Sequence, residues 1–163
     1  MKVFTEAENQ AWSKTLPGKM TSACIALRSG DKVLMVKAGY KDHWTFPSGI
    51  VDDKESPKQA AIRETQEEVG VVVDELSCSL LTAVYTASNG QDRDRFNFAF
   101  IAEVDQDNTQ LVVPNEEIES ADWVDINKIS ERAGNRGSYK IFEKYLTYPS
   151  ETEPYVEIIP SSV

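Results

Sequence analysis

The chain has 163 residues, of which 40% are hydrophobic and 27% charged, a composition that suits one domain with a buried core. Lys and Arg number 17 and Asp and Glu 27, which gives a formal net charge of −10. This charge argues against binding to a nucleic-acid polymer, which requires a basic face. No apolar run approaches the roughly 18–20 residues that span a bilayer, and no signal peptide is evident. We therefore expect a cytoplasmic protein without membrane contact.

The two cysteines, Cys24 and Cys78, lie in apolar, strand-like stretches. We expect buried free thiols in a reducing compartment, with a single disulfide as the less favoured alternative. One histidine and no close Cys/His spacing exclude a structural zinc site. Without repeats or low-complexity linkers, residues 1–163 are expected to form a single domain, with an N-terminal arm at 1–17 and a C-terminal tail at 149–163.

The first half of the chain predicts two strands, a loop and a well-marked helix. Residues 21–28 and 32–38 are strand-like and flank a Ser-Gly-Asp turn, which is typical of a hairpin. A loop rich in Gly and Pro follows, and residues 1–17 are expected to form an irregular arm or a short edge element. Ser56 with Gln59 forms a capping box for a helix over 57–69, and Gly70 ends it.

The second half predicts further strands and two helices. In chain order these are strands at 71–73, 76–87 and 95–104, a short strand that ends at Trp123-Val124, and helices at 126–133 and 138–148. Asp125 and Ser138 are the expected helix caps, and the tail 154–160 is strand-like. One face of the strand at 95–104 is assigned to the core and carries Phe96, Phe98, Phe100 and Ala102. The order of elements indicates an α/β (α+β) fold with a mixed β-sheet.

The helix at 57–69 carries Glu64, Glu67 and Glu68 at positions i, i+3 and i+4, which places the three carboxylates on one face. Like charges at this spacing repel one another. The opposite side is largely apolar, so we expect it to pack inward while the carboxylates point outward. A solvated acidic face is one interpretation. A Mg²⁺ site is the other, because Mg²⁺ prefers hard oxygen ligands.

The segment that starts at Gly49 decides between these interpretations. It resembles the Nudix box of the Nudix hydrolases, G-x5-E-x7-R-E-U-x-E-E-x-G-U, in which U is a bulky apolar residue. The matching charged and glycine positions are Gly49, Glu55, Arg63, Glu64, Glu67, Glu68 and Gly70. Thr65 departs from the family's usual aliphatic residue, and Ser48 stands where many members have a second glycine. The resemblance covers 49–71 closely and 21–133 loosely, and it implies an α/β/α sandwich with a mixed sheet.

The resemblance also implies roles for the box residues. Mg²⁺ or Mn²⁺ is expected on Glu64, Glu67 and Glu68, with a backbone carbonyl from Ser48. Arg63 is expected to position the glutamates, which its spacing to Glu67 allows.

The two glycines and the first glutamate of the box have other expected roles. Gly49 and Gly70 are structural in the motif. For Glu55, a structural role and a metal-binding role weigh equally.

Many members of the family use a further glutamate from outside the box as metal ligand or general base. The candidates are Glu116, Glu117 and Glu119. Glu117, six residues before Trp123, fits the family's segment best. It is therefore the predicted base and an additional metal ligand.

Substrate contacts are predicted from residue type alone. Cationic side chains suit phosphate and an aromatic ring suits a base, although each is otherwise a solvated charge or a core residue. The predicted contacts are Lys37, Lys41, Trp44, Arg93 and Arg95.

The resemblance therefore predicts a Mg²⁺- or Mn²⁺-dependent hydrolase that cleaves a diphosphate bond in a nucleoside diphosphate derivative by metal-activated water. Nucleoside triphosphates and dinucleoside polyphosphates rank above nucleotide sugars such as ADP-ribose. A non-catalytic nucleotide sensor on the same fold is the alternative, and the intact glutamate set argues against it. The apolar last helix and tail predict a homodimer, with closure of the monomer's own core as the alternative.

Overall fold

The computed structural model describes residues 5–90 and 93–159, and the two best-marked sequence signals form as predicted. The segments on either side of the Gly30 turn form β1 (Met20–Ser29) and β2 (Lys32–Ala38), which pair antiparallel. Ser56 caps α2 (Pro57–Val69) by the expected capping box with Gln59. Gly70 ends this helix at a φ of 76°, a left-handed conformation that glycine adopts without strain.

The strands form one mixed sheet in the order β6-β2-β1-β5-β4-β7, with β3 paired to β1 beside this path. The remaining strands are β3 (Ser48–Ile50), β4 (Ser79–Thr86), β5 (Arg95–Glu103), β6 (Ile118–Asp125) and β7 (Tyr155–Ile158). The pairs β1–β5 and β4–β7 are parallel and the other pairs are antiparallel. The predicted mixed α/β sheet is thus confirmed.

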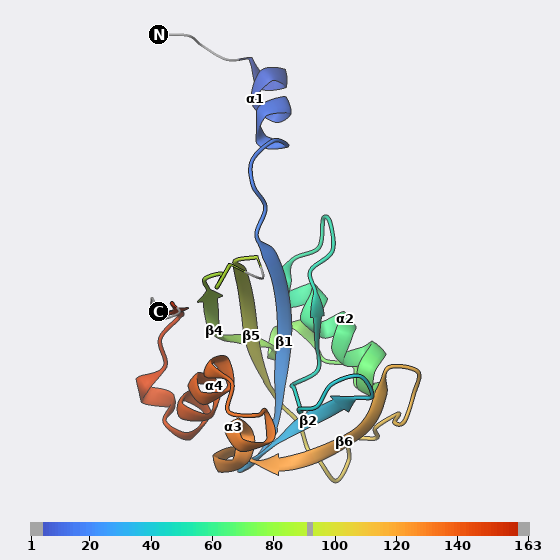
Figure 1. The fold of residues 1–163 in the computed structure, drawn as a ribbon. Coiled ribbons are helices and arrows are strands. Elements are labelled where there is room, and N and C mark those ends of the chain that lie inside the picture. Colours follow the sequence, from blue (N-terminus) through green and yellow to red (C-terminus); the bar gives the residue numbers. More distant parts are fainter. Residues whose placement is uncertain (1–4, 91–92, 160–163) are drawn as a thin grey trace.

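Helices cover both faces of the sheet, which gives the α/β/α layering (Figure 1). Along β1, Ala23, Ile25 and Leu27 belong to the core beneath α2. The alternate residues Cys24 and Ala26 face the opposite core, which α3 (Ile129–Arg132) and α4 (Gly137–Thr147) close. This alternation follows from the two-residue period of a strand. Short 3₁₀ turns connect these elements: η1 (Glu75–Ser77), η2 (Ile126–Lys128) and η3 (Pro149–Glu151).

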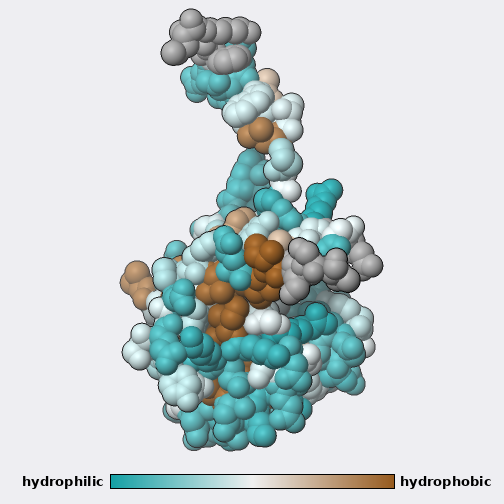
Figure 2. Space-filling view, turned by 60° about the vertical axis from the view of Figure 1, so that its left-hand side comes forward, coloured by the Kyte–Doolittle hydropathy of each residue, from teal (hydrophilic) through white to brown (hydrophobic). Residues whose placement is uncertain are grey.

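The N-terminal arm differs from the prediction, because its described part contains a helix, α1 (Glu6–Ser13). Thr5 and Glu8 form a capping box that satisfies the first free amides of the helix. The helix buries none of its side chains and stands clear of the sheet (Figure 1), and in the space-filling view the same end of the chain projects from the rest of the molecule (Figure 2). Residues 1–4 of the predicted arm lie outside the described residues.

The expectation for residues 71–87 was wrong at its start. Residues 71–73 form no strand; Val71 and Val73 pack against the α2-side core while the side chain of Val72 is exposed. The Asp74 carboxylate accepts the Leu76 amide hydrogen and so starts η1, which delays β4 to Ser79. A local side-chain cap therefore overrides an apolar run.

Two predicted helix caps were also wrong. Asp125 makes no capping hydrogen bond, and the segment after it divides into η2 and α3. The helix predicted from Ser138 begins one residue earlier, at Gly137, with Arg136 at the cap position and no side-chain cap. In the first turn of α3 the Glu143 carboxylate, from α4, accepts the Ser130 N–H at 2.7 Å instead.

Phe100 and Ala102 are buried as predicted, whereas Phe96 is only partly covered and contacts Tyr85, with 5.3 Å between ring centroids. The assignment of Phe96 to the core was therefore wrong, and Phe98 packs at the core's edge. The strand-like tail forms β7, and its last predicted residue, 160, lies outside the described part. Cys24 and Cys78 are buried free thiols, as expected. Across 5–90 and 93–159, every helix is too short or too polar to cross a bilayer.

Candidate active site

The start of the box is held against the sheet by β3. Ser48 and Gly49 pair with Cys24 and Ala23 of β1, and α2 packs over the same strand. A Cβ atom at Gly49 would lie 2.0 Å from the carboxyl carbon of Glu64. Because no side chain tolerates such a distance, glycine is required for the Glu64 carboxylate to approach the backbone.

The three glutamates of the acidic cluster differ in burial, which corrects the expectation that all point outward. The side chain of Glu67 is 55% exposed, that of Glu64 only 15%, and Glu68 is 5% exposed. Glu68 follows the buried residues Ala61 and Thr65 by seven and three positions. It therefore lies on the packed stripe of the helix.

Glu68 is the deepest carboxylate of the site. Its Oε2 accepts the backbone N–H of Ser48 at 2.9 Å. Burial raises the pKa of Glu68 to about 7, against the opposing effects of the Ser48 hydrogen bond and the positive charge of Lys41. The negative charges of Glu64 and Glu117 raise this pKa further. The site thus holds a carboxylate whose charge is poorly solvated, which a bound cation would stabilise.

Arg63 organises the other carboxylates. Its Nη1 donates to Glu64 at 2.7 Å and to Glu67 at 3.0 Å, so the predicted i, i+4 pair is present. Its Nε and Nη2 donate to the two carboxylate oxygens of Glu55 at 2.9 and 3.0 Å, and Nη2 also reaches the carbonyl of Ile50. Glu55 is therefore the bidentate partner that fixes the guanidinium.

The donor set is made of oxygen atoms, as Mg²⁺ requires. Within residues 5–90 and 93–159, no three acidic, His or Cys side chains already converge on one point. The reason is that Arg63 draws the carboxylates of Glu64 and Glu67 toward itself, whereas Glu68 is turned to Ser48. A metal ion held here would compete with the guanidinium for these carboxylates.

The structure distinguishes the outer glutamates. Glu117 is exposed, immediately before β6, and close enough to Glu68 to affect its pKa. Glu119 is directed to Lys37, with 3.8 Å between Nζ and Oε2. The segment around Glu117 is thus the one that lies near the acidic cluster.

The predicted substrate residues fall into two groups. Lys41 lies near Glu68, and Trp44, in the loop before the box, is half-buried under the guanidinium of Arg132 at 4.9 Å. Arg95, by contrast, begins β5 beside Met20. This is roughly 13 Å along β1 from the level of Ser48, at about 3.3 Å per residue.

The exposed side chain of Arg93 precedes this strand. The structure therefore does not bring Arg93 and Arg95 to the carboxylates. Lys37 forms the ion pair with Glu119 described above.

Sequence reasoning assigned no role to two residues near the site, although one of them, Asn115, begins the segment that resembles the family. The Tyr139 hydroxyl, from α4, accepts the backbone N–H of Phe46 at 2.8 Å and supports the loop before the box from below. The Asn115 side chain donates a hydrogen bond to the backbone carbonyl of Glu68 and accepts one from the backbone N–H of Glu117. An Asn two residues before Glu117 is typical of an Asx turn, a signal that could have identified it; Tyr139 offered no local signal.

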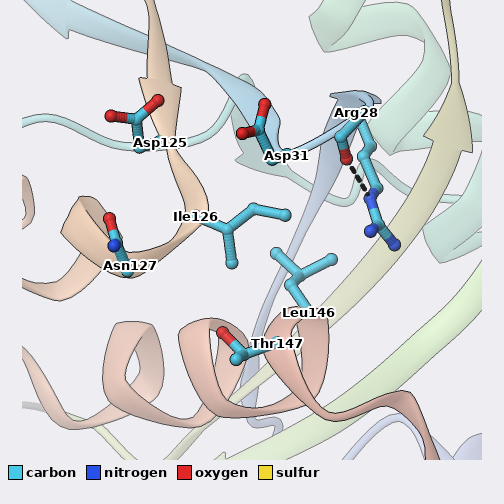
Figure 3. A pocket seen from close by; sticks show the side chains of 8 residues that line it. Arg28, Asp31, Asp125, Ile126, Asn127, Leu146 and Thr147 are labelled. Carbon is cyan, nitrogen blue, oxygen red and sulfur yellow. Dashed lines mark hydrogen bonds between the residues drawn. The ribbon is translucent and has the colours of Figure 1, made fainter.

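A pocket of about 610 Å³ lies elsewhere, between the β1–β2 turn, the end of β6 and the end of α4 (Figure 3). Asp31 and Asp125 line it, and the Arg28 side chain beside them donates to the carbonyl of Gly30 at 2.8 Å. None of the box residues lines this pocket. Its volume alone does not make it the site of the chemistry.

The chain is similar in sequence to one protein family and to several characterised proteins. The model of the NUDIX domain family matches residues 18–145. Mouse diphosphoinositol polyphosphate phosphohydrolase 3-alpha is 35% identical over 89 residues, which cover 53% of this chain and 51% of that protein. The 8-oxo-dGTP diphosphatase of Proteus vulgaris is 40% identical over 58 residues, 33% of this chain and 50% of that protein. The chain thus spans about half the length of these curated relatives.

Among solved structures, the MutT protein from Bacillus halodurans superposes with a TM-score of 0.67 at 18% identity, covering 86% of this chain and 91% of that one. At this identity the likeness concerns the fold. It agrees with the α/β layering described above.

Proposed function

The chain belongs to the Nudix family, and on this premise we propose that it is a Mg²⁺- or Mn²⁺-dependent hydrolase of a diphosphate bond in a nucleoside diphosphate derivative. The observation that carries the proposal is the complete acidic cluster. Glu64 and Glu67 are bonded to one guanidinium, and a third carboxylate, Glu68, is buried against the first residues of the box. A binding protein has no need to bury at this point a carboxylate that is held by a backbone N–H rather than by a cationic side chain.

The residues proposed to hold the metal are Glu64, Glu67 and Glu68, with the Ser48 carbonyl and Glu117 as further oxygen ligands. When bound, the metal neutralises the diphosphate and lowers the pKa of a coordinated water. The buried charge of Glu68 supports this assignment, because a cation would offset its desolvation.

The remaining chemistry falls to the chain's own groups. A water oxygen bonds to one phosphorus, the bridging P–O bond breaks, and the bridging oxygen leaves with the second phosphoryl group. Glu117 accepts the proton of the attacking water. Arg63, locked by Glu55, holds Glu64 and Glu67 in place, and Lys41 binds a phosphate of the substrate.

For the substrate, we propose a nucleoside triphosphate or a dinucleoside polyphosphate. The similarity to a protein named 8-oxo-dGTP diphosphatase supports the first class. Lys41 close to Glu68 and the Arg132–Trp44 stack in the loop before the box support a phosphate chain with a base attached. The net charge of −10 disfavours a long polyanionic substrate.

The test is a substrate panel with Mg²⁺, read by chromatography of the products. It contains nucleoside triphosphates, dinucleoside polyphosphates, nucleotide sugars and a diphosphoinositol polyphosphate. We expect cleavage of members of the first two classes, loss of cleavage in chelator, and recovery with Mg²⁺ or Mn²⁺. Cleavage confined to nucleotide sugars or to the inositol compound would overturn the substrate ranking.

Tight nucleotide binding without cleavage would instead favour the sensor alternative. Cleavage that continues at full rate after exhaustive chelation would refute the metal dependence. We also propose a cytoplasmic location, which the two buried free thiols, Cys24 and Cys78, support.

A further inference from the structure

Asn115 connects the end of α2 to the segment that carries Glu117. Its Nδ2 donates to the backbone carbonyl of Glu68 at 2.8 Å and to that of Val112 at 3.1 Å. Its Oδ1 accepts the backbone N–H groups of Glu117 at 3.0 Å and Ile118 at 2.8 Å. One side-chain amide, 47 positions after Glu68, therefore joins the backbone of the deepest glutamate of the cluster to the backbone of the predicted base.

We infer that Asn115 is a positioning residue for the reaction proposed above, because it sets where Glu117 stands relative to Glu68. The inference rests on the proposed function, in which Glu117 acts on the attacking water. Asn115 itself touches neither substrate nor the reacting atoms; it acts through Glu117.

The electrostatics of Glu117 explain why its backbone has to be held. In the described part of the chain, no ion pair restrains its carboxylate, whereas Glu119 is paired with Lys37. The negative charge of Glu117 contributes to the raised pKa of Glu68, so the two carboxylates are close enough to repel each other. A carboxylate that is repelled by its neighbour and lacks a cationic partner keeps its place only if the main chain is fixed. Asn115 supplies that restraint by two amide hydrogen bonds.

Only an amide side chain satisfies this arrangement. It offers two donors and an acceptor with two lone pairs, and all four capacities are used. An Asp of the same shape would keep the two accepted bonds and lose both donated ones, and its negative charge would face two carbonyl oxygens. The link to Glu68 would then be lost while the turn at Glu117 survives.

A second contact holds the same segment without involving Glu117. The Val112 N–H donates to the carbonyl of Val69 at 2.9 Å, and a Cβ atom at Gly70 would lie 2.6 Å from the Val112 side chain. This contact keeps the segment docked on α2 when the Asn115 amide is altered. A change at Asn115 is therefore expected to shift Glu117 without undocking the whole segment.

The test compares Asn115→Asp and Asn115→Ser with Asn108→Asp, which adds the same charge as the first variant in the exposed turn before this segment. We expect both Asn115 variants to lose about 10-fold or more in kcat, a loss typical of residues that orient a catalytic group. We expect KM to change little, while the lost hydrogen bonds lower the melting temperature in chelator by a few degrees without unfolding the protein. Asn108→Asp should retain wild-type kcat.

A double-mutant cycle separates positioning from a structural role. If Asn115 acts through Glu117, the Asn115→Ser/Glu117→Gln double variant is no slower than Glu117→Gln alone. Losses that multiply, or a wild-type kcat in both Asn115 variants, would overturn the inference and leave the proposed function standing. A wild-type protein that cleaves no member of the panel would overturn the proposed function itself.

Discussion

Removing the charge of the buried Glu68 carboxylate should have opposite effects on stability and on activity. We expect the metal-free protein to become more stable and the enzyme to become slower. In Glu68→Gln the side-chain oxygen still accepts the Ser48 N–H, while the ionisable group is gone. The folded protein raises the pKa of Glu68 from its usual 4.5 to about 7. At about 1.4 kcal/mol per pH unit, ionising this group costs the metal-free fold about 3 kcal/mol.

The direction in which stability changes with pH follows from the linkage between proton binding and folding. Because the folded state binds the Glu68 proton more tightly than the unfolded chain, this contribution to stability is complete below about pH 4.5. It is lost as the pH rises through about 7. In chelator at pH 8, Glu68→Gln should therefore melt above the wild type, by up to about 10 °C for a chain of this size. Near pH 4.5 the difference should vanish.

The assay is thermal unfolding in chelator across this pH range, followed by turnover in Mg²⁺. We expect the same variant to lose about 100-fold or more in kcat, because a charge that holds the metal is missing. Glu67→Gln is the matched control: its side chain is 55% exposed and paired with Arg63, so no pH-dependent gain is expected. A Glu68→Gln variant that is less stable than the wild type at pH 8, or equally shifted at every pH, would refute the reasoning.

Three further outcomes are expected. Glu117→Gln should lower kcat strongly and Glu119→Gln, at the partner of Lys37, should be nearly silent; equal effects would show that the outer glutamate is misassigned. Gly49→Ala should weaken Mn²⁺ binding, measured by calorimetry, since the added methyl displaces the Glu64 carboxylate; unchanged affinity would contradict the close approach. Light scattering at micromolar concentration should give twice the 18.2 kDa chain mass, and a monomer mass would refute the predicted homodimer.

Most of the apolar residues on which the homodimer prediction rests are used within the monomer. The apolar side chains of α4 are used in the monomer, where Tyr139, Phe142, Tyr145 and Leu146 join the core. The tail pairs with β4 in parallel, and Val156 and Ile158 pack against the same core. At the end of α4 and along the tail, Tyr148, Tyr155 and Ile159 stay exposed, so an interface between two copies at this end would have to use them.

The helix that carries the acidic cluster could be predicted almost completely from local residues. Its start at Pro57, its end at Val69 and the pairing of Arg63 with Glu67 all depend on residues within a few positions of each other. Capping boxes, i, i+4 spacing and a left-handed glycine act locally, so a single chain displays them in full. The same is true of the box as a motif, and of the hairpin around Gly30.

Which of these residues come into contact, and how deeply they are buried, depends on contacts between distant segments. Glu68 reaches Ser48 across 20 positions and Asn115 across 47, and both contacts depend on how the strands pair. The pairing of β5 with β1 likewise leaves Arg95 at the level of Met20, away from the carboxylates. Residue type records the charge a side chain carries. Its depth, its neighbours and its pKa come from packing between segments that are distant in the chain, because burial and long-range contacts exist only once the sheet has formed.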